Sequence, residues 1–153
     1  KARHAAQQSG LPALADDSGL EVDALGGRPG VYSARFAGEN ATDADNNRHL
    51  LESLKDHESS ALTARFRCVM VYLRHPEDPS PVIGQGLWEG EIVREPRGHG
   101  GFGYDPYFLV PEYHRTFGLL SATVKHRISH RAKAFSRFIP LLLALRDQFS
   151  PQS

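Results

Sequence analysis

The chain has 153 residues, with 18 Lys and Arg against 18 Asp and Glu, so its formal net charge is zero. This balance gives no reason to expect nucleic-acid or membrane binding, and any positive potential that recognises a ligand has to be local. The length suits a single domain with a sizeable core. Cys68 is the one cysteine and cannot form an internal disulfide, which fits a reducing compartment. No apolar run approaches membrane-spanning length.

The N-terminal stretch, residues 1–13, has the sequence KARHAAQQSGLPA, typical of the last turns of a helix. Gly10 would close this helix and Pro12 would keep it from continuing.

Two neighbouring acids follow a short apolar run at residues 11–15. Asp16 and Asp17 are followed by Ser18 and Gly19, which predicts a strand that turns just after its acids. Such a corner can hold a hard cation through carboxylate oxygens and contact a phosphate through the hydroxyl and backbone amides. The alternative is an Asp-Ser-Gly turn that only caps the strand.

Two further stretches carry the groups expected around a flat polar ring. Residues 98–106 read GHGGFGYDP, in which glycines around Phe102 let a ring lie against backbone and Asp105 can accept from a ring N–H. Residues 125–131 read KHRISHR and concentrate Lys, His and Arg in seven positions. Acids, an aromatic platform and a cationic patch together indicate a nucleotide or another phosphoester ligand.

Local patterns predict the remaining elements. We expect a surface helix over residues 39–56 with Thr42 as N-cap, an alternating strand over 62–74 that holds a structural Cys68, and a turn over 75–81. A return strand over 82–93 contains Trp88, which either stacks on a base or takes a half-buried position, and glycines at 84, 86 and 90 that suggest bulges. A short strand at 107–110 precedes a helix starting at Ser121 and a largely buried helix over 129–149, kinked at Pro140.

Three of these stretches, DDSGLEVDALGGRPGVYSARFAG, GGFGYDPYF and ISHRAKA, resemble the inosine triphosphate pyrophosphatases, also called HAM1-like proteins, in the same order and over nearly the whole chain. The resemblance implies an α/β fold with a long twisted mixed sheet, flanking helices, and two lobes around a substrate cleft. Family members begin with a strand, a phosphate loop and a Glu-bearing helix. Lys1 matches the last residue of that helix motif, so residues 1–153 are expected to form a single domain lacking those elements.

The resemblance also implies hydrolysis of ITP, dITP and XTP to monophosphate and pyrophosphate, which removes them from the nucleotide pool. It makes Asp17 the general base and a Mg²⁺ ligand, with Asp16 as a metal-supporting neighbour. If side chains alternate along the strand, only one acid faces the cleft, and we favour Asp17. The expected substrate-binding residues are Lys1, Ser18, Phe102, Gly103, Tyr104, Asp105, Lys125, His130 and Arg131.

Base selection is expected from three donors, Lys125, His130 and Arg131, which favour a 6-oxo purine when protonated. For His130 the alternative is a structural histidine at a helix start. The resemblance further implies a homodimer, and the single cysteine fits a cytoplasmic location. A second hypothesis for the whole chain is a nucleotide-binding module without catalysis.

Overall fold

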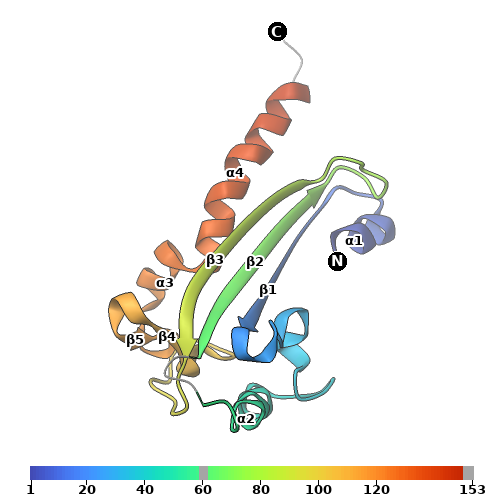
Figure 1. Ribbon diagram of the computed structural model, residues 1–153. Helices are drawn as coiled ribbons and strands as arrows, with labels where there is room; N and C mark the ends of the chain where they lie inside the picture. The colour runs from blue at the N-terminus through green and yellow to red at the C-terminus, as the bar shows by residue number, and fades with distance from the viewer. Residues whose placement is uncertain (59–61, 150–153) are drawn as a thin grey trace.

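The computed structural model describes residues 1–58 and 62–149. A long sheet forms its centre, with α4 lying along it and α1 near the far end of the β2–β3 hairpin (Figure 1). The strands, in the order β1-β2-β3-β4-β5 across the sheet, are β1 (Ala13–Val22), β2 (Thr63–Leu73), β3 (Val82–Ile92), β4 (Phe108–Val110) and β5 (Arg115–Thr116). The α-helices are α1 (Ala2–Ser9), α2 (Asp43–Ser53), α3 (Ala122–Ile128) and α4 (His130–Phe149). Short 3-10 helices span Asp23–Leu25, Gly30–Arg35, Asp105–Tyr107, Pro111–Tyr113 and Phe117–Leu119.

An α/β fold with a long sheet and flanking helices is confirmed. The strand pairing differs from the expected mixed sheet, because every pairing within residues 1–58 and 62–149 is antiparallel. Each strand leads to its neighbour by a connection that reverses the chain direction, so no parallel crossover arises among these strands.

The expected turn after the two acids is wrong. β1 continues through Asp16, Asp17, Ser18 and Gly19 to Val22, and each of these residues is paired with β2. The ladder with β2 pairs the backbone groups that point toward β2, and this pairing outweighs the local turn preference of an Asp-Ser-Gly sequence. The acids therefore lie in the middle of a strand, where side chains alternate between the two faces of the sheet.

The glycines of β3 do not form bulges, because the β2–β3 register is continuous from Thr63 to Tyr72. They instead allow helix α4 to approach the sheet. A Cβ at Gly86 would collide with the His130 carbonyl, and one at Gly84 would lie 2.9 Å from the Ala134 carbonyl oxygen. This close contact fixes the start of α4, and with it His130, against the strands.

The helix ends follow the expected capping. Thr42 caps α2 in a full capping box with Asp45, Ser121 accepts from the Val124 N–H at the start of α3, and Gly10 ends α1 with φ at 67°. These contacts satisfy backbone groups that a helix end leaves unpaired.

Helix α4 is less buried than expected. Ala134 and Phe138 are buried against Cys68 and Met70 of β2, whereas the Phe135 side chain is 52% exposed. One side of the helix packs on the sheet, and the described chain supplies no second layer over its other sides. None of the described helices is long and apolar enough to cross a membrane.

The main core lies at the other end of the sheet, under α2 and the β4–β5 hairpin. Leu20, Leu50, Phe108 and Val110 are fully buried there. Trp88 is buried in this cluster rather than half-buried, with the Lys133 ammonium 4.2 Å from its ring centroid, so a stacking role for Trp88 is not supported. Cys68 is fully buried in β2, as a structural cysteine would be.

Candidate functional site

The two adjacent acids of β1 lie on opposite faces of the sheet. Asp17 pairs with Lys1, at the start of α1, with 2.8 Å between Asp17 Oδ1 and Lys1 Nζ. Asp16 pairs with Arg131 on α4, also at 2.8 Å. Helices α1 and α4 contact opposite faces of the sheet, so Asp16 and Asp17 pair with different cations. Because side chains alternate along a strand, the Asp16 side chain lies on the same face as Ser18.

A pocket of about 170 Å³ opens on the α4 side of β1. Ser18 and His130 line it, and their Ser18 Oγ and His130 Nδ1 atoms are buried without a hydrogen-bond partner among the described residues. Phe102 lies at the rim with 72% of its surface exposed. Buried polar atoms are normally paired, so two unpaired ones in one pocket indicate a missing polar ligand or water.

His130 forms part of the floor of this pocket. Its ring stacks on Phe66, with centroids 4.9 Å apart and planes 16° from parallel. Burial, with a smaller contribution from the neighbouring Arg131 charge, lowers the pKa of His130 to about 4. The imidazole is therefore neutral at physiological pH and presents one donor and one acceptor, which differs from the protonated donor expected from sequence.

A second pocket, of about 430 Å³, adjoins the first and shares Phe102, Asp105 and His130 with it. Lys125 and Arg131 line this second pocket. Lys125 donates to Asp105 Oδ2 at 2.8 Å, so both groups are already partnered. Burial raises the pKa of the Asp105 carboxyl, while the Lys125 contact opposes that effect.

Tyr104 lines the first pocket and is anchored to the loop beyond β1. Its hydroxyl donates to the Ser33 carbonyl oxygen at 2.7 Å, and burial raises the pKa of that hydroxyl. In the described chain the Tyr104 hydroxyl therefore serves to hold the loop.

Helix α2 contributes contacts that sequence reasoning missed. Asp43 Oδ2 accepts from the Gly103 N–H at 2.7 Å, and Asn47 Nδ2 donates to the Gly103 carbonyl oxygen at 2.9 Å. The two polar groups lie four positions apart on one helix, but nothing in the sequence indicated a partner some 60 residues away.

The predicted site residues therefore form two groups. Ser18, the residues from Phe102 to Asp105, Lys125, His130 and Arg131 surround the two adjoining pockets on the α4 side. Lys1 and Asp17 line a separate pocket of about 330 Å³ beside α1. Among the described strands β1 pairs only with β2, and the two groups lie on opposite faces of β1.

The Asp16 and Asp17 carboxylates would suit a hard cation that is held by few protein ligands. No group of three or more His, Cys, Asp or Glu side chains gathers with metal-binding geometry in residues 1–58 and 62–149. Mg²⁺ commonly uses only one or two carboxylates and completes its shell with water and substrate phosphates. The exposed Asp17 carboxylate suits that mode, while Asp16 lies on the other face. The metal assignment stays a prediction.

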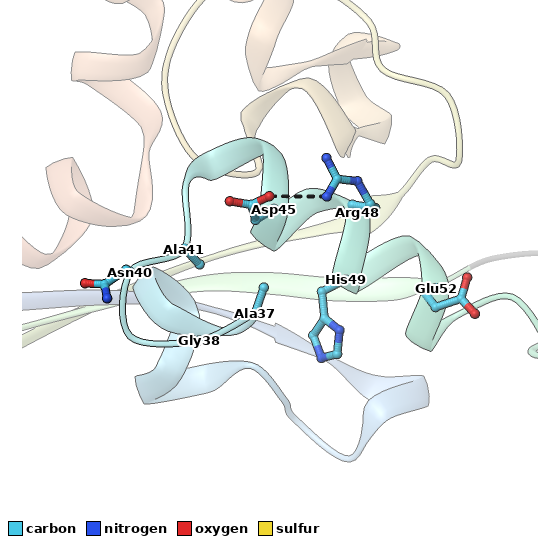
Figure 2. A pocket seen from close by; sticks show the side chains of 8 residues that line it. All are labelled: Ala37, Gly38, Asn40, Ala41, Asp45, Arg48, His49 and Glu52. Atoms are coloured by element: carbon cyan, nitrogen blue, oxygen red, sulfur yellow. Dashed lines mark hydrogen bonds and ion pairs between the residues drawn. The ribbon is translucent and has the colours of Figure 1, made fainter.

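Another hollow, of about 630 Å³, lies between α2 and the loop before it (Figure 2). Asp45 and Arg48 pair across its wall at 3.2 Å, and His49 projects into the space beside Ala37. The predicted site residues do not line it.

The chain belongs to the Ham1 family, whose model matches residues 1–141. It is 58% identical over 147 residues to a dITP/XTP pyrophosphatase of Shigella flexneri, covering 96% of this chain and 73% of that protein. It is 60% identical over 134 residues to the dITP/XTP pyrophosphatase of Thioalkalivibrio sulfidiphilus, covering 88% of this chain and 68% of that protein. The solved structure of a HAM1 protein from Coxiella burnetii superposes with a TM-score of 0.89 at 51% identity, over 94% of this chain and 73% of that one. The structure of the Staphylococcus aureus Ham1 protein superposes with a TM-score of 0.81 at 41% identity, over 97% of this chain and 73% of that one.

Proposed function

We propose that this protein hydrolyses purine nucleoside triphosphates with non-canonical bases (ITP, dITP and XTP) to nucleoside monophosphate and pyrophosphate. The observation that carries the proposal is the pocket beside β1, where Ser18 Oγ and His130 Nδ1 are buried and unpaired beneath the exposed Phe102 ring. A flat ring with polar edges would stack on Phe102 and satisfy both atoms. The similarity to dITP/XTP pyrophosphatases at 58% and 60% identity supports this ligand class.

Base discrimination follows from the donors that surround the pockets. Arg131 carries only donors, and the neutral His130 imidazole offers one donor and one acceptor. A 6-oxo group can accept from Arg131, whereas the 6-amino group of adenine would place a donor against a donor there. The neutral His130 can accept as well as donate, so the discrimination rests on Arg131. A hydrogen bond to a charged group contributes about 1.5–3 kcal/mol. Hypoxanthine and xanthine are thus favoured over adenine.

The triphosphate would reach from the base pocket at Ser18 to Asp17 and Lys1, which lie on the other face of β1. Asp17 and Ser18 also line a common pocket of about 100 Å³ beside Gly30, which would give the phosphates a route between the two groups. The Lys1–Asp17 ion pair is solvent-exposed on both sides and weak, so a phosphate can replace Asp17 as the partner of Lys1.

Hydrolysis between the α and β phosphates then needs a water aimed at the α-phosphorus. Asp17 would accept a proton from that water, and Lys1 would neutralise phosphate charge. Asp17 would also hold Mg²⁺, which when bound neutralises charge on the phosphate oxygens. Asp16 would reach such an ion only through water, because its side chain points to the other face and pairs with Arg131.

The alternative of a nucleotide-binding module without catalysis is not favoured, because relatives at this level of identity are curated as pyrophosphatases. We also propose a cytoplasmic homodimer. Exposed apolar side chains on α4, Phe135, Leu141 and Leu143, would suit burial against a second copy. Light scattering of the purified protein tests this; a monomer at micromolar concentration would contradict it.

The function is tested by the steady-state kinetics of the full-length protein with ITP, XTP and ATP in the presence of Mg²⁺. We expect kcat/KM for ITP and XTP to exceed that for ATP by about 10–10²-fold, the effect of one charge-assisted hydrogen bond that adenine cannot accept. Equal values for ITP and ATP would contradict the proposal.

A further inference from the structure

Helix α2 holds the loop that carries Phe102 through both backbone groups of Gly103. Gly103 adopts a left-handed conformation with φ at 59°, and its N–H and C=O point to Asp43 and Asn47 respectively. One residue thereby has both backbone groups bound by side chains of a single helix. The Phe102 N–H adds a third anchor by donating to Asp105 Oδ2 at 3.2 Å.

The Phe102 side chain itself has no comparable support. It is 72% exposed, at the rim of both pockets, so its position depends on the backbone that follows it. An exposed aromatic that is to stack on a ligand pays less ordering entropy on binding when its backbone is fixed beforehand.

We propose that Asp43 and Asn47 are positioning residues that clamp the Gly103 backbone and thereby hold Phe102 over the ligand pocket. The inference rests on the proposed function only in taking that ligand to be the purine base. Asp43 lines the pocket and could also contact a ligand, whereas Asn47 is not among the lining residues and reaches the loop through its hydrogen bond to Gly103.

Removing either side chain of the clamp should weaken nucleotide binding without slowing the hydrolysis step. Asp43→Ala and Asn47→Ala should each raise KM for ITP about 5- to 20-fold, the effect of one lost hydrogen bond, while kcat changes less than about twofold. Asp43→Asn keeps an acceptor oxygen and should restore KM to within about threefold of the wild-type value. Because both side chains hold one residue, the double variant should raise KM by less than the product of the single effects.

Asp45→Ala is the matched control. Asp45 lies two positions after Asp43 in the first turn of α2 and completes its capping box, and its side chain bonds to Thr42 and Arg48 rather than to Gly103. Its loss should weaken the helix end by removing one half of the capping box while leaving KM for ITP unchanged. An equal rise of KM in Asp43→Ala and Asp45→Ala would mean that helix stability, not the clamp, sets the affinity.

Hydrogen–deuterium exchange of residues 101–105 gives a readout independent of activity. Exchange should accelerate in Asp43→Ala and Asn47→Ala and remain at the wild-type rate in Asp45→Ala. Unchanged exchange in both clamp variants, or a KM rise confined to Asp43→Ala, would overturn the proposal. If the wild-type protein failed to hydrolyse ITP, the proposed function would fall, and the exchange comparison alone would decide the clamp.

Discussion

The buried His130 makes stability fall as the pH drops below neutrality. Its pKa is lowered to about 4 in the folded protein from an unperturbed 6.5, chiefly because burial penalises the charged ring. The folded-state pKa lies below the unfolded one, so the unfolded chain takes up the proton first as the pH falls. The stability that the folded protein gains from keeping His130 neutral is present above about pH 6.5 and is lost as the pH falls toward 4.

The size of the effect follows from the two pKa values. Throughout pH 7 to 5 the unfolded state holds more of a proton at this residue than the folded state, and the difference approaches one proton at pH 5. Integrated over this range, the difference lowers the unfolding free energy by about 2 kcal/mol. Other titrating groups also contribute over this range, and a variant that lacks only the His130 imidazole separates them.

The assay is urea denaturation of the wild-type protein, His130→Asn and His126→Asn at pH 7, 6 and 5. The wild type should lose about 2 kcal/mol more than His130→Asn between pH 7 and 5. His126 is exposed on α3, so His126→Asn should follow the wild type. Parallel pH profiles for the wild type and His130→Asn would refute a neutral, buried His130.

Four further predictions concern single substitutions. Asp17→Asn in the full-length protein should lose most of its kcat with ITP and Mg²⁺ while still binding the nucleotide in calorimetry; near wild-type turnover would remove Asp17 from the chemistry. Arg131→Ala should lower the ITP-over-ATP ratio of kcat/KM by about 10- to 100-fold with little change for ATP, whereas an equal loss for both substrates would assign Arg131 to phosphate or structure. Cys68→Ala should stay active and lose about 1–2 kcal/mol in denaturant titration, and abolished turnover in a folded protein would reveal a role for the thiol. Gly86→Ala should destabilise by about 3 kcal/mol or more, because its Cβ would collide with the His130 carbonyl; an unchanged melting temperature would disprove the tight α4–β3 contact.

Local patterns in the sequence were sufficient for most of the elements. The alternation around Cys68 predicted β2, and Thr42 predicted the start of α2 because a cap is a contact between near neighbours. The grouping of His130 with Phe102 was available only through the family resemblance, because residues 28 positions apart meet through the packing of α4 on the sheet.

The predictions that were wrong relied on local residue preferences, which do not include contacts with segments distant in the sequence. The Asp16–Gly19 stretch has turn residues, yet β2 pairs with all of it. The β3 glycines suggested bulges, but the space beside Gly84 and Gly86 is filled by α4 and that beside Gly90 by Phe108 and Leu109 of β4. Likewise, the Asp43 and Asn47 contacts to Gly103 could not be predicted, since an acid in a first helical turn is already explained by the helix dipole.

The most direct test is product analysis of ITP hydrolysis by the full-length wild-type protein and Asp17→Asn with Mg²⁺. The account predicts IMP and pyrophosphate in equal amounts from the wild type and almost no product from Asp17→Asn. IDP with inorganic phosphate as the products, or equal product formation by both proteins, would contradict it.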